Sequence, residues 1–481
     1  MELAHIALEA VRRVEGVSYA DARVVAHEAE TLALKDADIE KHVRERSAGI
    51  GVRVLYRGAW GFGAQPGLIA DGAAQAARDA LASARAAASL GEGRVRLVEE
   101  EPQRGTWETP LAEDPFAVPL DRKLADLEAA LAILRGPNAT AEARMVWRRE
   151  RKRLCTTEGT DVSQVITFGG AGIRIVLRDG DDVAVRTWPM DYDGGVRGAG
   201  YETIADLALA ANAPRLRAEA AELLAAPPLP AGTRTLILDT PQLALQIHES
   251  CGHPTESDRA LGEEISLAGG SFLTPDKLGR FRYGAPIVNL SADSLAGLGM
   301  GTFGWDDEGV PARKTPLVAR GMFVGYLSSR ETAARLGLGR SAGCLRAESW
   351  SRPAIIRMIN VSLEPDPNGP ATLDDLVADT ADGVLMTQNR SWSIDDLRLN
   401  FQFGCEAAWE VKDGRRGRMF KKPMYTGSTP RFWAGCDAIC GPGAFRMWGY
   451  TTCGKGDPIQ LMAVGHGTAP ARFRNVEVGS S

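Results

Sequence analysis

The sequence "GIGVRVLYRGAWGFGA" at residues 49–64 has the alternation that decides the fold of the first half of this chain. Val52, Val54 and Tyr56 alternate with Arg53, Leu55 and Arg57, and "RGAW" then turns the chain back. Side chains that alternate with a period of two are typical of β-strands. A second stretch of the same kind, "GAGIRIVLRDGDDVAVRTW", occupies residues 170–188. Both stretches predict strands that are joined by tight turns.

Helical patterns flank both strand-rich stretches. The first residues of the chain carry an apolar stripe at helical spacing, and alanine- or leucine-rich segments follow at residues 69–91, 119–136 and 204–226. We therefore predict the order helix, strand meander, helix, repeated once. This half is either a duplicated unit or a pair of α+β units that are similar without common ancestry.

A proline-rich break, "APPLPAG" at residues 226–232, follows the second unit. Beyond it glycine becomes frequent, and the strand patterns outnumber the helical ones. We predict an α+β fold with an N-terminal domain over residues 1–226 and a β-rich C-terminal domain over residues 227–481. One of the few helices of the second domain carries the histidine motif considered below.

Composition limits the classes of function. The chain has a net charge of −6 and a pI near 5.7, which argues against a protein that binds nucleic-acid phosphates. No run of about 18 apolar residues predicts a membrane span, and the first residues lack the pattern of a signal peptide. Seven cysteines, an odd number spread over 481 residues, indicate free thiols in a reducing cytoplasm.

The motif "HESCGHPTES" at residues 248–257 reads His-Glu-x-x-x-His. Zinc peptidases usually have one residue fewer between the two histidines. On a straight α-helix, residues five apart are separated by a net rotation of about 140°, whereas residues four apart differ by about 40°. The extra residue must therefore be absorbed by a bulge or by the end of the helix if both rings are to reach one ion.

The surrounding residues offer a means of distortion. A helix capped by Asp239 or Thr240, with Pro241 as its first residue, would place the motif in its last turns. We expect Gly252 to tolerate unusual dihedral angles and Pro254 to bias His253 away from the helical region. π-type bulges of this kind are often found at functional sites.

Glu249 follows the first histidine, as the general base does in ordinary zinc peptidases. Its carboxylate could take a proton from a metal-bound water. On the motif alone, two histidines and a glutamate that pack and cap a helix end explain the pattern equally well.

A catalytic zinc needs a third protein ligand. Cys453, in "TTCGKGDP", is one candidate; we predict an exposed loop there, where nearby Lys455 would favour the thiolate. His466 is a second candidate. Cys436 and Cys440 form a Cys-x-x-x-Cys pair that we interpret as buried thiols.

Several segments, taken in order, resemble the TldD/PmbA family of metallopeptidases on its TldD-like, metal-bearing side. The resemblance spans nearly the whole chain, and the ordered set is specific although each piece alone is not. The resembling segments are the strand pair at 49–64, "HESCGH" (248–253), "WDDEGVPARKTPLVARGMFVGYLSSRETAARLG" (305–337), "RPAIIRMINVSLEP" (352–365) and "CGKGDPIQLMAVGHGTAPARFRNVEVG" (453–479).

The resemblance implies a zinc-dependent peptidase. His248, His253 and Cys453 match the family's metal ligands, and Glu249 matches its catalytic glutamate. It also implies unfolded or small peptides as substrates, and a dimer, either a homodimer or a heterodimer with a metal-free PmbA/TldE-like sister subunit. Pro254 departs from the small residue that we expect there.

Other features have alternative interpretations. Asp306, Asp307 and Glu308 could bind a substrate amine or support the metal site, or they could form a polar turn, which we favour. Lys455 could touch the substrate backbone or simply be solvated, and the charge run at 148–153 predicts a solvated strand face. A catalytically silent scaffold and a DNA-gyrase modulator, an old label for the family, are the alternative functions; intact metal residues and the acidic pI argue against them.

Overall fold

The computed structural model describes residues 2–91, 95–190, 195–267 and 269–480. Its first half builds one sheet in the order β3-β2-β1-β5-β6-β4, with β7 paired to β6. All of these pairs are antiparallel except β4 with β6. The strands are β1 (Val17–Lys35), β2 (Asp38–Tyr56), β3 (Ala59–Pro66), β4 (Arg104–Glu108), β5 (Ala139–Thr156), β6 (Asp161–Asp179) and β7 (Asp182–Trp188).

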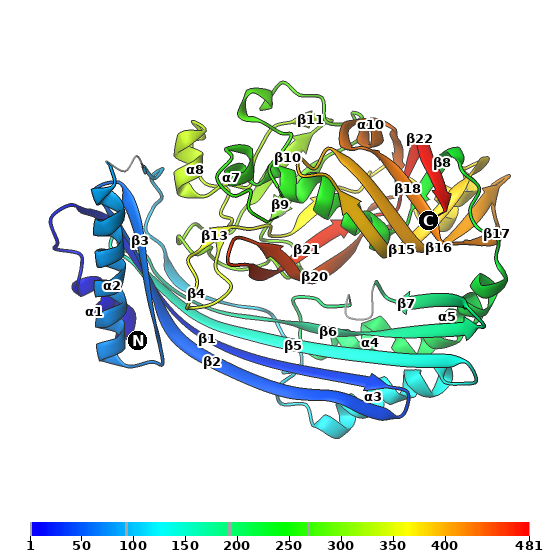
Figure 1. The fold of residues 1–481 in the computed structure, drawn as a ribbon, viewed down its shortest axis with the longest axis horizontal. Helices are drawn as coiled ribbons and strands as arrows, with labels where there is room; N and C mark the ends of the chain where they lie inside the picture. Colours follow the sequence, from blue (N-terminus) through cyan, green and yellow to red (C-terminus); the bar gives the residue numbers. More distant parts are fainter. Residues whose placement is uncertain (1, 92–94, 191–194, 268, 481) are drawn as a thin grey trace.

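Helices cover the face of this sheet that points away from the second half (Figure 1). The apolar cluster around α1 and α2 includes residues of β1 and β2, and a second cluster joins α3 and α5 to β5 and β6. The order helix, meander, helix therefore occurs twice. The helices are α1 (Leu3–Glu9), α2 (Ala70–Ser89), α3 (Leu120–Leu134), α4 (Thr203–Leu207) and α5 (Leu209–Ala225).

The four central strands are unusually long. β1, β2 and β6 have 19 residues each and β5 has 18, against a usual range of about 3–10. They arch beneath the second half (Figure 1). Residues 50–55 are buried without the alternation expected of a half-exposed strand, because α2 packs on one face and the second half covers the other.

The second half is rich in β-structure and holds a sheet in the order β15-β8-β22-β18-β16-β17, with β19 paired to β22. A smaller sheet has the order β11-β10-β9-β14, and β12-β13 and β20-β21 form separate pairs. The strands are β8 (Gly232–Leu238), β9 (Leu290–Asp293), β10 (Lys314–Ala319), β11 (Met322–Phe323), β12 (Leu345–Arg346), β13 (Ile355–Ile356), β14 (Val361–Leu363), β15 (Asp382–Ile394), β16 (Asn400–Lys412), β17 (Arg415–Lys421), β18 (Pro423–Ser428), β19 (Cys436–Ile439), β20 (Arg446–Lys455), β21 (Gln460–Thr468) and β22 (Ala471–Ser480).

Short helices connect these strands, and the proline-rich segment lies between α5 and β8. The α+β fold class is confirmed, whereas the domain boundary at residue 226 stays a prediction. Among the described residues, no helix is long and apolar enough to cross a membrane. The helices are α6 (Thr240–Ile247), α7 (Ser257–Ala260), α8 (Arg330–Arg335), α9 (Leu373–Ala378) and α10 (Thr429–Ala434), with a π-helical turn η1 (His248–Gly252) and 3₁₀ turns η2 (His253–Thr255), η3 (Pro275–Lys277) and η4 (Pro442–Ala444).

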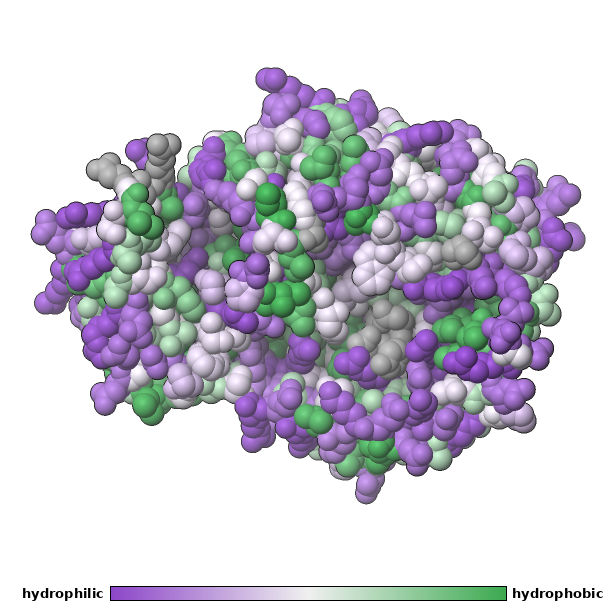
Figure 2. All heavy atoms as spheres, viewed as in Figure 1, coloured by the Kyte–Doolittle hydropathy of each residue, from purple (hydrophilic) through white to green (hydrophobic). Residues whose placement is uncertain are grey.

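The surface seen in the same orientation has a mixed character. Figure 2 shows hydrophilic residues spread over this face, with hydrophobic residues in small groups between them. A hollow runs between the lower, sheet-bearing part and the upper part, where the two halves meet.

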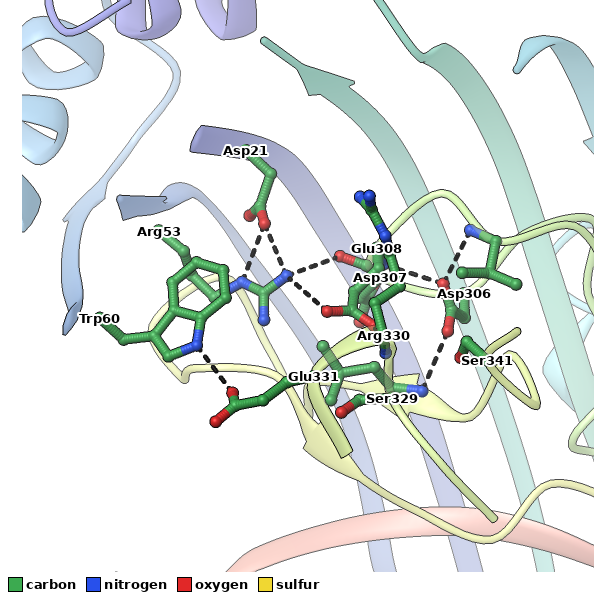
Figure 3. Close-up of polar contacts among 12 residues, drawn as sticks. Asp21, Arg53, Trp60, Asp306, Asp307, Glu308, Ser329, Arg330, Glu331 and Ser341 are labelled. Carbon is green, nitrogen blue, oxygen red and sulfur yellow. Dashed lines mark hydrogen bonds and ion pairs between the residues drawn. The ribbon is translucent and has the colours of Figure 1, made fainter. Parts of the chain in front are cut away.

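The acidic run Asp306–Glu308 joins the two halves in a polar turn, as we favoured, in which the Gly309 N–H donates to the Asp306 carbonyl at 3.1 Å; the turn is buried between the halves. All three carboxylates are buried. Figure 3 shows the Arg53 guanidinium of β2 between Asp21 of β1 and Glu308, with nitrogen–oxygen distances of 2.6 Å to Asp21 and 3.9 Å to Glu308. The run is thus embedded in charges supplied by the first sheet.

Asp307 makes the most direct of these contacts. Its Oδ1 lies 2.5 Å from Lys152 Nζ and its Oδ2 lies 3.5 Å from an Arg23 nitrogen, and all three side chains are buried. Lys152 belongs to the charge run at 148–153, so the expectation of a solvated strand face holds for Arg148 and Arg151, which are exposed, but not for Arg149 and Lys152, which are buried. A buried lysine needs a counter-charge, and Asp307 supplies it to Lys152.

Candidate metal centre

The helix that carries the histidine motif begins where the sequence predicts. Asp239 is the N-cap of α6, and its Oδ1 accepts a hydrogen bond from the Thr240 N–H at 2.7 Å. Pro241 occupies the first turn, where a missing N–H leaves no bond unmade. The helix is buried along its whole length between β15 and the β20–β21 hairpin.

The extra residue of the motif is absorbed by a π-helical turn over His248–Gly252. The His253 N–H donates to the His248 carbonyl, five residues back, instead of four. The predicted bulge is confirmed, and it brings the ring centroids of His248 and His253 to 4.8 Å from each other.

The reasons that we expected for this bulge are wrong in two details. Gly252 has an ordinary helical conformation, with φ −56° and ψ −67°. A Cβ at this position would lie 2.0 Å from Sδ of the buried Met358, so a larger residue would force either Met358 or the turn to move. His253 is also helical, with φ −59° and ψ −45°, although Pro254 follows it; the tight turn imposes a conformation that the proline alone disfavours.

Cys453 reaches the same place from the other end of the chain. It lies on β20 and is 5% exposed, so the expectation of an exposed loop is wrong. Its Sγ is 3.8 Å from His253 Nε2. β20 pairs with β21 to form a hairpin that packs against α6, and this packing buries the thiol.

His248, His253 and Cys453 together form a donor set that suits a metal ion. One ligand atom from each lies within 4.8 Å of the others. Tetrahedral zinc with ordinary Zn–N and Zn–S distances places its nitrogen and sulfur ligands about 3.5 Å apart. Three protein ligands that leave the fourth position open are typical of a catalytic zinc site.

Each imidazole has a second partner that fixes its ring. His253 Nδ1 lies 3.0 Å from a Glu256 carboxylate oxygen, and His248 Nδ1 lies 2.8 Å from His466 Nε2. In both rings the remaining nitrogen, Nε2, is the one available to an ion. Partners of this kind orient histidine ligands in metal sites. His466 therefore stands behind His248 and does not belong to the donor set.

Lys455 is neither solvated nor positioned to hold a substrate. It is fully buried, and its Nζ lies 2.8 Å from both carboxylate oxygens of Asp258 and 3.4 Å from Glu256 Oε1. Burial opposes the charge on Glu256, but Lys455 and Arg259 together hold the pKa of its carboxyl well below its usual range. The carboxylate that orients His253 therefore stays ionised.

The electrostatics of the donor set favour metal binding. Burial lowers the pKa of His248 to about 4, so its imidazole is neutral near pH 7. Burial alone would raise the pKa of the Cys453 thiol, but Arg357 and His253 outweigh this effect and lower it. The largest favourable charge therefore comes from Arg357, not from Lys455 as the sequence suggested.

Glu249 is buried beside the donor set and is held by an arginine. An Arg398 nitrogen lies 2.7 Å from Glu249 Oε2, and both side chains are less than 10% exposed. Arg398 belongs to the turn between β15 and β16, far from the motif in sequence. Its side chain fixes the direction of the carboxylate.

A second group of donors, His5, Cys155 and Asp161, also lies within 4.8 Å. Its electrostatics differ. Burial and the neighbouring Asp161 raise the pKa of the Cys155 thiol to about 11, and Arg153 already pairs with Asp161 at 2.7 Å. A protonated thiol beside an occupied carboxylate is a poor metal ligand.

Three family models match most of the chain. They are described as PmbA/TldA metallopeptidase domain 1, central domain and C-terminal domain, and they match residues 20–88, 113–226 and 231–480. The chain belongs to this PmbA/TldD family of metallopeptidases.

Curated relatives of this PmbA/TldD metallopeptidase carry the same description. A metalloprotease of Methanothermobacter thermautotrophicus is 27% identical, over 97% of this chain and 96% of its own. One from Synechocystis is 28% identical, over 95% and 94%. A zinc metalloprotease TldD homolog of Saccharolobus solfataricus is 25% identical over 40% of each chain.

Solved structures share the fold of this metallopeptidase. TldE of Thermococcus kodakarensis has a TM-score of 0.71 at 18% identity, and the similarity covers 98% of this chain and 99% of that one. A Thermotoga maritima protein described as a modulator of a DNA gyrase has a TM-score of 0.77 at 16% identity, with 99% of both chains covered.

Sequence reasoning did not identify several residues of the site. These residues are Glu256, Arg357 and Arg398. Arginine and glutamate are common, and the partners Lys455, Cys453 and Glu249 lie far from them in the sequence. Glu256 alone offered a local signal, since it follows His253 by three residues, the spacing of neighbours on a helix.

The steric role of Gly252 generates a prediction. Gly252→Ala should displace the turn from Met358, misplace His253 and reduce metal content, at a cost of about 1–3 kcal/mol in stability. Metal analysis and thermal unfolding measure both effects. Gly339→Ala is the matched control, because an added Cβ there meets nothing within 4 Å; equal behaviour of the two variants would contradict this role.

Proposed function

We propose that this chain is a zinc-dependent peptidase in which His248, His253 and Cys453 hold the ion. The observation that carries the proposal is the convergence of His248, His253 and Cys453 in one buried place. Burial lowers the pKa of both imidazoles, which keeps them neutral, and the pKa of the thiol is lowered as well. The description of the Saccharolobus relative as a zinc metalloprotease also supports zinc.

In this proposal Glu249 is the general base. Its carboxylate takes a proton from the attacking water and later delivers it to the nitrogen of the leaving amine. Arg398 holds the carboxylate in place through the 2.7 Å contact. When bound, zinc supplies Lewis-acid chemistry, which polarises the peptide carbonyl and lowers the pKa of water.

Unfolded or small peptides are the substrates that we propose, from the resemblance to the family. A cavity of about 790 Å³ between the first sheet and β21 could admit such a chain. Met462, which lines this cavity, lies directly opposite Cys453 in the hairpin. Acidic and basic side chains line its walls together, which suits a polar peptide backbone more than an apolar ligand.

We further propose a dimer in the cytoplasm, either with a second copy of this chain or with a metal-free PmbA/TldE-like sister. Seven free cysteines support a reducing compartment. The donor set is already buried in the single chain, so the dimer is supported by the family resemblance and not by a need to cover the metal. The Thermotoga neighbour is described as a modulator of a DNA gyrase, but at 16% identity its similarity shows the fold alone; the intact donor set argues against a silent scaffold.

The ligand assignment predicts the effect of removing the thiol. Cys453→Ala should lose most of its zinc, because two imidazoles alone form an incomplete site. Elemental analysis of the purified protein measures this loss. Cys251→Ala is a matched control, since this thiol lies between the two histidines but its pKa is raised by burial. Full zinc occupancy in Cys453→Ala would remove the thiol from the site.

The assignment of Glu249 as the base predicts that peptide cleavage can be lost without loss of zinc. Glu249→Gln should keep fold and zinc while peptide cleavage falls by about 10²–10⁴-fold, the usual contribution of a positioned general base. Single-turnover cleavage with a parallel zinc measurement tests this. Glu410→Gln, a half-exposed acid, should cleave normally. Zinc lost together with activity would make Glu249 structural instead.

The assembly proposal predicts a mass. Light scattering should show a dimer of the 51.5 kDa chain, alone or with a co-expressed metal-free homologue. A monomer under both conditions would contradict it.

A further inference from the structure

A second histidine lies directly behind the first proposed ligand. His466, on β21, is fully buried, and its Nε2 lies 2.8 Å from His248 Nδ1. Its own Nδ1 lies 3.0 Å from the Val361 carbonyl oxygen of β14. The three groups form a chain of two hydrogen bonds that ends on the main chain.

The Val361 carbonyl, the last acceptor in this series of hydrogen bonds, determines which nitrogen of each imidazole carries a proton. A carbonyl oxygen only accepts, so His466 Nδ1 must carry a proton. Both rings are buried, and the polar partners that the described residues give His466 are a carbonyl oxygen and an imidazole, neither of which offsets the charge of a buried imidazolium. Each ring is therefore neutral and has one donor and one acceptor. His466 Nε2 therefore accepts, and His248 Nδ1 donates. Two unprotonated nitrogens would otherwise face each other at 2.8 Å.

We propose that His466 is a positioning residue that selects the Nδ1-protonated form of His248 and so leaves the His248 Nε2 lone pair facing His253 and Cys453. This inference rests on the proposed zinc site, because it concerns how one of its ligands is held. It gives the two histidine ligands different supports. Glu256, an ionised carboxylate, holds His253, whereas a neutral imidazole anchored to the backbone holds His248.

The arrangement has a consequence for affinity. A ligand whose tautomer is already correct needs no rearrangement when the ion arrives, and loss of such a partner usually weakens metal binding by about 10–100-fold. The partner itself is not consumed, so a side chain that accepts the same hydrogen bond should replace it.

The test compares His466→Phe with His466→Gln in the full-length chain. Zinc affinity is measured by competition with a chromophoric chelator after the native metal has been removed. We expect His466→Phe to bind zinc about 10–100-fold more weakly and His466→Gln to stay within a few-fold of wild type, because its Oε1 can accept from His248 Nδ1. His42→Phe, a partly exposed histidine of the first sheet, controls for loss of an imidazole.

The outcomes separate this inference from the proposed function. Wild-type affinity in His466→Phe would overturn the positioning role while the zinc site stands. Zinc lost from both His466 variants as completely as from His248→Ala would make His466 a ligand, which also overturns it. Zinc retained in both His248→Ala and Cys453→Ala would instead overturn the proposed site.

A second measurement needs neither metal nor a substituted His466. The chain has 6 histidines, so ¹⁵N-histidine labelling gives few imidazole signals, and His248→Ala assigns the one of interest. The metal-free wild type should show His248 protonated at Nδ1. Protonation of His248 at Nε2 would refute the positioning role of His466, whatever the zinc affinities are.

Discussion

One hydrogen bond, from the His253 N–H to the His248 carbonyl, allows the rest of the site to form. Without this five-residue step the two imidazoles would project about 140° apart and could not share an ion. The step also needs space on its outer side, where Met358 packs directly against Gly252. The π-helical turn and the absence of a side chain at Gly252 together allow His248 and His253, although five residues apart, to point toward one ion.

Buried ion pairs then fix the position of Cys453 on β20 relative to the turn that carries the two histidines. Alternate residues on a strand share a face, so Cys453 and Lys455 of β20 project the same way. Lys455 is anchored to Asp258 and Glu256, and Glu256 also holds His253. Because an unpaired buried lysine is very unfavourable, this contact sets the strand against the turn and places the thiol beside the histidine.

The sequence predicted the local elements well and the distant contacts poorly. The strands at 49–64 and 170–188, the cap at Asp239 and the bulge in the motif depend on neighbouring residues, and all three are confirmed. The surroundings of Cys453 depend on Arg357 and on packing against α6, which no local pattern encodes. Asp307 shows the same limit: its sequence context reads as a polar turn, but its partners Lys152 and Arg23 come from another sheet. Periodicity identifies the type of element, whereas tertiary packing decides which of its residues are buried and selects the partner of each buried charge.

The arginine that holds Glu249 shows how a remote turn and the proposed base depend on each other. Arg398 has φ +64°, a left-handed conformation that costs a non-glycine residue about 1–2 kcal/mol. A glycine would avoid this cost but would remove the guanidinium. The 2.7 Å contact with Glu249 and the burial of both groups give a physical reason for an arginine at this strained position. Strain of this kind persists only where the surrounding structure fixes it, and here Thr429, which donates to the Arg398 carbonyl, and Asp395, whose carbonyl accepts from its N–H, do so. The β15–β16 turn therefore orients the Glu249 carboxylate through Arg398, although it contributes no metal ligand.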